Sequence, residues 1–126
     1  MGVIDFHTHP WLPRYLNPGT VEFIRDISPA VQEHEDALSD PVFAAELLRE
    51  QGVDRAVVLA EHCRETSGDV RTEAVLEYCA AVPDFFLPFA SIHPRLDARP
   101  EKLLKEYIAA GARGLKLYPS YQFFHP

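Results

Sequence analysis

The chain has 126 residues, of which 47% are hydrophobic and 25% are charged, a composition typical of one globular domain. Its formal net charge is −7 and no basic cluster stands out, which argues against a nucleic-acid-binding protein. The two cysteines form no Cys-x-x-Cys pair, and no apolar run approaches the roughly 20 residues of a membrane-spanning helix. We therefore expect a soluble, cytoplasmic protein with a single domain at residues 1–126.

Four short apolar runs predict strands, at residues 3–9, 55–61, 85–92 and 113–118. Three amphipathic stretches between them predict helices, at residues 40–52, 69–82 and 99–111. Two of these helices have start and stop signals, with Pro41 or Pro100 near the beginning and Gly52 or Gly111 after the end. Strands that alternate with helices of this length predict an α/β fold with parallel strands and right-handed connections.

The first connection, residues 10–40, is much longer than the others. Its start is rich in proline and contains Trp11, residues 20–27 predict a short helix, and Ser28-Pro29 begins another irregular or helical piece. A long insertion directly after the end of a strand is where α/β enzymes place substrate-binding structure. We expect residues 10–40 to lie over a site, with Trp11 in contact with the substrate.

The first strand carries an acid and two histidines at alternate positions. Because residues two apart share a face of a strand, Asp5, His7 and His9 are expected on one face, toward a closed interior, and Phe6 on the other, against the helices. A His-x-His pair at the end of a strand can supply two neutral nitrogen ligands to one divalent ion, and Asp5 could orient a ligand or bind the ion. From these residues alone, two hydrogen-bonded histidines at a polar strand end remain an equal alternative.

Four segments resemble the amidohydrolase superfamily, in particular the amidohydrolase-related group that includes aminocarboxymuconate-semialdehyde decarboxylase. They are "IDFHTHP", "GVDRAVVLAE", "FFLPFASIHPR" and "GARGLKLYPSYQFFHP". The resemblance implies a (β/α)8 TIM barrel with its site at the carboxyl ends of the strands, and a divalent metal, Zn in type, bound by His7 and His9. It also implies a histidine from each of the fifth and sixth strands, and an aspartate from the eighth strand that acts as general base on the metal-bound water.

A complete (β/α)8 barrel takes about 250 residues. The chain is therefore expected to hold the first four βα units, an N-terminal half of an incomplete barrel that is inactive by itself. Two histidines do not complete a catalytic zinc site, which needs about three protein ligands.

Lys116 in the fourth strand is expected to point inward with Gly114 and Tyr118. A lysine in that position could hold a substrate carboxylate, or act as a base if its pKa were lowered. By resemblance it could also carry a carbamate that bridges two metals. A salt bridge with Asp5 or Glu61 is the structural alternative.

Four more residues are candidates on weaker grounds. His93 ends the third strand and is expected either to take part in catalysis or to form strand-end hydrogen bonds. Glu61, Tyr118 and Gln122 follow strands and are expected to contact the substrate. His62 is expected at the edge of a loop, in water.

The leading hypothesis is a metal-dependent hydrolase that uses an activated water to cleave an amide, ester or lactone. One alternative is a metal-dependent decarboxylase of an unsaturated carboxylic acid, which the inward Lys116 would suit. Another is a non-catalytic half-barrel that assembles with a second chain. A phosphoesterase of the PHP or TatD type fits poorly, since a glutamate ligand would be expected near Lys116. The expected partner is a small-molecule substrate, which would bear a carboxylate if Lys116 binds it. The chain is also expected to associate with a missing C-terminal half or with a second copy of itself.

Overall fold

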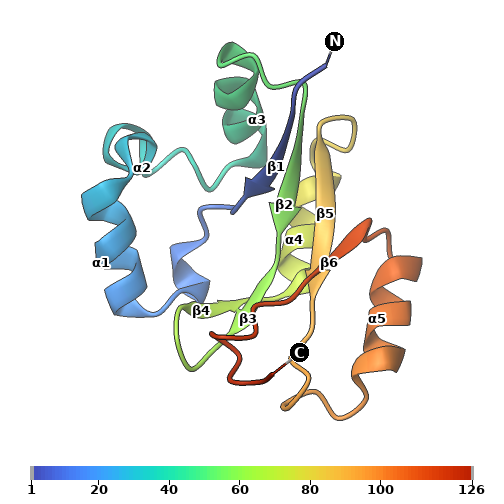
Figure 1. The fold of residues 1–126 in the computed structure, drawn as a ribbon. Coiled ribbons are helices and arrows are strands. Elements are labelled where there is room, and N and C mark those ends of the chain that lie inside the picture. The colour runs from blue at the N-terminus through green and yellow to red at the C-terminus, as the bar shows by residue number, and fades with distance from the viewer. Residues whose placement is uncertain (1, 126) are drawn as a thin grey trace.

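The computed structural model describes residues 2–125, which form an α/β fold (Figure 1). In chain order its elements are β1 (Ile4–Thr8), the 3-10 helix η1 (Pro13–Tyr15), α1 (Pro18–Ile27), α2 (Pro29–His34), α3 (Pro41–Glu50), β2 (Arg55–Leu59), β3 (Glu61–Cys63), β4 (Gly68–Val70), α4 (Thr72–Ala80), β5 (Phe86–Ser91), α5 (Pro100–Ala109) and β6 (Gly114–Lys116). Within the described range, no helix is both long and apolar enough to cross a membrane.

The main sheet has four strands in the order β1-β2-β5-β6, and every neighbouring pair is parallel. The four predicted strands and their order are thus confirmed. The strands run side by side in Figure 1, with α4 behind the sheet and α5 beside β6. Because all four strands run in one direction, their carboxyl ends lie at one edge, where the sequence analysis placed the functional residues.

The predicted helix signals act as expected. The Asp40 carboxylate accepts a hydrogen bond at 2.9 Å from the backbone N–H of Val42, and Pro41 occupies the first turn of α3. Gly52 after α3 has φ +83° and Gly111 after α5 has φ +113°. These are left-handed conformations that glycine adopts without steric cost, so each glycine ends its helix.

The core lies between the sheet and its helices. Ala56, Val58 and Ala60 project from the β2 segment toward α3 and α4, where they pack with Val75 and Tyr78. A second cluster joins β5 to α5 through Ala90, Ile92, Tyr107 and Ala112. One face of the sheet is therefore covered by helices, as in any parallel sheet of alternating strands and helices.

An antiparallel hairpin, β3–β4, follows β2 and was not predicted. Residues 69–82 were expected to be one helix, but Asp69 and Val70 belong to β4 and the helix begins at Thr72. The hairpin docks on the insertion. A Cβ atom on Gly68, whose φ is +149°, would lie 2.6 Å from the backbone oxygen of Tyr15. Glycine thus allows β4 to approach the insertion closely.

The other face of the sheet holds an aromatic contact that contradicts one prediction. Phe6 was expected to face the helices, but its ring packs edge to face on Phe89, with centroids 5.5 Å apart. Phe89 is on the opposite face from Ala90, a member of the helix-side core, and its ring lies so close over Gly114 that a Cβ there would be 2.4 Å away. Phe6 therefore lies on the uncovered face, where 65% of it is exposed.

Candidate metal centre and adjoining cavities

A register shift in β1 sets the direction of its polar side chains. Asp5 pairs with Ala56 and Thr8 with Val58, so three residues of β1 advance against two of β2. Such an irregularity re-aims the side chains that follow it. Asp5 lies beside a helix-side residue, and its carboxylate accepts a hydrogen bond from the backbone N–H of His7 at 3.0 Å. The expected inward direction of Asp5 was wrong, because strict alternation fails at this shift.

His7 and His9 converge as the sequence predicts. Their Nε2 atoms lie 3.2 Å apart, and both residues are exposed. Two imidazoles that point their Nε2 atoms at one another cannot both direct lone pairs there without repulsion, unless a proton or a cation lies between them. The structure brings together the pair of nitrogen atoms that a metal ligand motif requires.

Glu61 lies directly behind this pair. Its Oε2 atom is 3.5 Å from Nδ1 of His9, and its other oxygen accepts a hydrogen bond from the Ser67 hydroxyl in the hairpin turn. A carboxylate near Nδ1 favours the proton on that nitrogen and leaves the lone pair on Nε2, which faces His7. Burial lowers the pKa of His9, and Glu61 acts in the opposite direction. The neutral imidazole is the form that coordinates metals.

Lys116, at the end of β6, acts electrostatically on His9 and contacts the Tyr118 ring. The Lys116 charge contributes to lowering the pKa of His9, after burial and the His7 charge. Its Nζ atom lies 5.0 Å from the centre of the Tyr118 ring, which in turn stacks on Tyr121 with centroids 4.1 Å apart. Burial raises the pKa of Tyr118, so its phenol stays protonated at neutral pH. A cation over an aromatic face is thus held near the histidine pair.

Two adjoining cavities border this region. The first, of about 420 Å³, is lined by residues that include Trp11, His9 and Glu61. The second is a more open groove of about 600 Å³ between the insertion and the loop after β6, and its lining includes Glu61 and Tyr118. Three of the four predicted substrate residues, Trp11, Glu61 and Tyr118, therefore line a cavity.

The fourth predicted substrate residue, Gln122, lies elsewhere. It is fully buried, and its amide nitrogen donates hydrogen bonds to the carbonyls of His62 and Ile92 at 3.1 and 2.8 Å. Its amide oxygen accepts a hydrogen bond from the backbone N–H of Tyr118 at 3.0 Å. With the amide so occupied, Gln122 holds the loop after β6 against the ends of β3 and β5, and does not reach a cavity.

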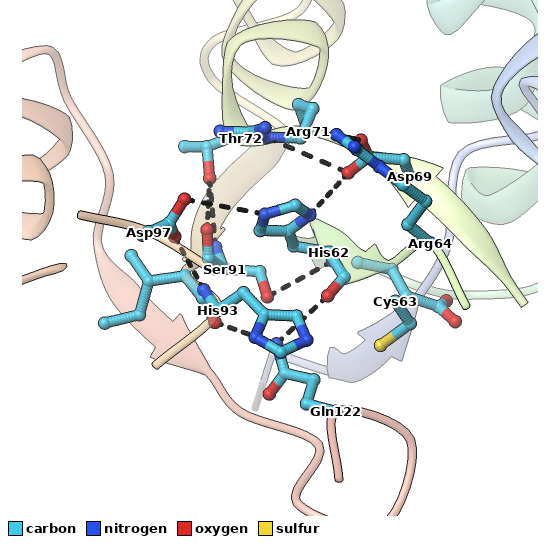
Figure 2. A network of polar contacts seen from close by, with 12 residues as sticks. His62, Cys63, Arg64, Asp69, Arg71, Thr72, Ser91, His93, Asp97 and Gln122 are labelled. Atoms are coloured by element: carbon cyan, nitrogen blue, oxygen red, sulfur yellow. Dashed lines mark hydrogen bonds and ion pairs between the residues drawn. The ribbon is translucent and has the colours of Figure 1, made fainter. Parts of the chain in front are cut away.

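A buried polar network surrounds His62, which was expected in water (Figure 2). That expectation was wrong, since His62 is 2% exposed. Its Nδ1 atom lies 2.6 Å from the Asp69 carboxylate and its Nε2 atom 3.5 Å from that of Asp97. One local feature could have indicated this burial. The dipeptide Ser67-Gly68 is typical of a turn, and a hairpin around that turn pairs His62 with Asp69.

His93 also belongs to this network and not to the cavity lining given above. It is 3% exposed, and its ring packs edge to face on His62 with centroids 5.4 Å apart. Its backbone N–H donates to Asp97 at 2.7 Å, and its Nδ1 atom accepts from the backbone of Arg95 at 3.3 Å. Of the two alternatives for His93, these contacts support strand-end hydrogen bonding.

The donor atoms around β1 fit part of a metal site. Two nitrogen ligands of a tetrahedral zinc ion, with bonds of about 2.0–2.1 Å, lie about 3.3 Å apart. The Nε2 atoms of His7 and His9, at 3.2 Å, match that spacing. Among residues 2–125 no group of three or more His, Cys, Asp and Glu side chains is placed so that it could hold a metal ion. The described chain thus offers two ligands, and a complete site needs at least one more.

Comparison with known proteins agrees with this fold. The model of a family described as Amidohydrolase matches residues 4–126, so the chain belongs to the amidohydrolase family, whose members generally use divalent metals. Among solved structures the chain is similar to an uncharacterised TIM-barrel protein, Bb4693, from Bordetella bronchiseptica, with 21% identity and a TM-score of 0.66. No curated protein matches the chain.

The match to the Bordetella protein covers 91% of this chain and 43% of that chain. At this level of identity the likeness shows the fold alone. The four-stranded parallel sheet and its helices are therefore part of a TIM barrel, as expected from the sequence.

Proposed function

We propose that the protein acts as a metal-dependent hydrolase, with His7 and His9 as two ligands of a divalent ion, and that this ion is Zn²⁺. The observation that carries the proposal is the 3.2 Å approach of the two Nε2 atoms at the carboxyl end of β1. Membership of the amidohydrolase family supports it. The ion, when bound, would supply a Lewis acid that activates water for attack on a carbonyl carbon.

The chain's own residues would prepare this chemistry. Glu61, whose carboxylate lies 3.5 Å from Nδ1 of His9, would keep the proton on that nitrogen and so orient His9, and the Ser67 hydroxyl donates a hydrogen bond to Glu61. The Lys116 ammonium, near His9, would attract an anionic part of the substrate. The substrate would enter through the groove that Glu61 and Tyr118 line.

The test uses the intact protein loaded with Zn²⁺, Mn²⁺ or no metal, and a panel of one ester, one amide and one lactone. The proposal expects hydrolysis of at least one of the three, its loss on chelation and its loss in His9→Ala. Hydrolysis that survives both chelation and His9→Ala would contradict it.

A decarboxylase is the second candidate, because the position of Lys116 suits a substrate that bears a carboxylate. Release of CO2 from an unsaturated carboxylic acid in the presence of metal would favour it over hydrolysis. Replacement of Lys116 by Met should then raise KM strongly while metal binding is unchanged. A KM that does not change would leave the hydrolase as the better proposal.

The uncovered sheet face supports one further proposal about partners. Ile4 and Phe6 are 52% and 65% exposed, and both belong to β1 at the edge of the sheet. Exposed apolar strand edges pair readily with further strands. We expect this face to be covered by other barrel strands or by a second copy. Light scattering of the 126-residue chain would detect the second copy as a dimer.

A further inference from the structure

The cavity of about 420 Å³ beside His9 is mainly apolar. Its walls come from the insertion, from α3 and from the hairpin, and they include Leu16, Ile24, Val31, Leu38, Leu47 and Leu48. Protein interiors are close-packed and hold few voids larger than a water molecule. An apolar cavity of about 150 Å³ is enough to take up benzene. This cavity therefore has room for an aromatic ring or a branched alkyl group with several further atoms.

Trp11 lines the cavity and carries a hydrogen-bond donor that has no partner among residues 2–125. The side chain is 7% exposed, and the donor is its buried Nε1 atom. Buried N–H groups are normally paired, and an unpaired one is unfavourable. The Trp11 backbone is held by the Ser39 hydroxyl, which donates to its carbonyl at 2.8 Å. An acceptor atom on a bound molecule would satisfy the indole.

The walls are tied together, so the cavity is formed before a ligand binds. The Asn17 side chain donates hydrogen bonds to the carbonyls of Arg64 and Thr66, at 3.2 and 2.8 Å, and its backbone N–H donates to Ser67. These contacts join the insertion to the β3–β4 hairpin. A preformed cavity binds without the entropy cost of ordering its walls.

The cavity also adjoins the reacting end of the site. Thr20, Ile24 and Glu61 line both this cavity and the open groove, so the two meet at Glu61, next to His9. A molecule that fills the cavity would place its other end at the histidine pair.

We propose that this cavity binds the apolar arm of the substrate, and that the substrate class is acyl compounds with an aryl or branched alkyl group and an ether or carbonyl oxygen that accepts a hydrogen bond from Trp11. The acyl part of this statement rests on the proposed function. The binding of an apolar group with an acceptor oxygen rests on the cavity lining alone.

The test measures binding to the metal-free intact protein, with acetophenone and ethylbenzene as probes. Both carry the same ring, and only acetophenone has an acceptor oxygen. Trp11 is the chain's one tryptophan, so its fluorescence reports from the cavity wall. We expect acetophenone to bind about fivefold more tightly than ethylbenzene, as one hydrogen bond would give. The Trp11→Phe variant, measured by calorimetry, should bind the two probes equally.

Variants that fill the cavity distinguish probe binding in the cavity from binding to other apolar surfaces. Ala44→Phe and the milder Ala30→Leu both add volume to its lining and should weaken both probes by about tenfold or more. Ala109→Phe, on the exposed side of α5, is the matched control and should change neither affinity.

Two results would overturn the inference. One is the absence of probe binding, and the other is binding that folded Ala44→Phe and Ala30→Leu do not weaken. Equal affinity of the wild type for the two probes would overturn the role of Trp11. If the probes bind as expected but no metal-dependent hydrolysis is found, the proposed function fails and the cavity's ligand class stands.

Discussion

Two histidine pairs lie at the carboxyl ends of the strands, and they differ in what surrounds them. The rings of His7 and His9 have centroids 5.2 Å apart, and those of His62 and His93 are 5.4 Å apart. The first pair is exposed, whereas the second is 2% and 3% exposed. Ring spacing is therefore almost the same in the two pairs, and their chemical roles depend on their hydrogen-bond partners.

In the buried pair both nitrogen atoms of His62 face carboxylates, those of Asp69 and Asp97, so neither nitrogen is open to a ligand (Figure 2). In the exposed pair the two Nε2 atoms face one another across 3.2 Å. Buried polar groups with all partners in place rigidify a fold. Converging imidazoles without such partners are poised to bind a cation.

The largest expected effect is on metal affinity. Replacing His7 with Ala removes one of two nitrogen ligands and should weaken Zn²⁺ binding by more than about 100-fold, beyond what the loss of a supporting residue costs. His34→Ala, on α2, is the control and should leave the affinity unchanged. Calorimetric titration of the intact protein measures both. If Zn²⁺ affinity falls equally in His7→Ala and His34→Ala, the exposed pair is not a specific metal site.

The next effect concerns the buried pair. His62→Phe keeps an aromatic ring but leaves the carboxylates of Asp69 and Asp97 without the imidazole. We expect the free energy of unfolding to fall by about 1–3 kcal/mol, as when buried polar groups lose a hydrogen-bond partner. Urea denaturation measures this loss. Zn²⁺ affinity, measured where the variant is folded, should stay within about twofold of the wild type. If His62→Phe is as stable as the wild type but no longer binds Zn²⁺, the buried pair binds the metal and the assignment of the two pairs is wrong.

A smaller effect is expected at Glu61, which supports the exposed pair. Glu61→Gln removes the charge that faces Nδ1 of His9 and should lower Zn²⁺ affinity by about tenfold. Glu65→Gln, an exposed residue of the same hairpin, is the matched control. If both variants bind Zn²⁺ as the wild type does, Glu61 does not orient His9.

The smallest effect is on the pH dependence of stability. Burial lowers the pKa of His93 below its ordinary value of about 6.5, so the unfolded chain takes up this proton at a higher pH than the folded chain. Stability should be full above about pH 6.5 and should fall as the pH drops below that value, by at most about 1.4 kcal/mol per pH unit for this one group.

The pKa of His9 is also lowered by burial and contributes with the same sign. The measurement therefore compares His9→Ala with the double variant His9→Ala/His93→Gln, by urea denaturation between pH 5 and pH 7.5. The double variant should show the shallower fall. Identical slopes would mean that His93 is as accessible to protons as an exposed histidine.

Most of the fold was predictable from local signals. The strands follow short apolar runs, and α3 and α5 begin and end at the Pro and Gly residues that the sequence shows. The β3–β4 hairpin was missed because its strands have three residues each, too few for a periodic pattern. The register shift in β1 was missed because it depends on pairing with β2, and the wrong faces of Asp5 and Phe6 follow from it.

The candidate site was predictable in its ligands and less so in its surroundings. His7 and His9 lie two residues apart on one strand, so a local pattern was enough to bring them together. The contacts of Glu61 with His9 and Ser67 join three segments of the chain, and neither these contacts nor the part played by Ser67 was predicted. Gln122 and His62 form hydrogen bonds with groups between 7 and 60 residues away in the chain, and a local sequence pattern does not predict such contacts.

The central claim is that the exposed histidine pair, and not the buried one, binds the metal. Anomalous diffraction at the zinc edge, from crystals of the intact protein grown with ZnCl2, tests it most directly. The account predicts one anomalous peak, bonded to the Nε2 atoms of His7 and His9. A peak bonded to His62 or His93, or a zinc-saturated crystal without density between His7 and His9, would contradict it.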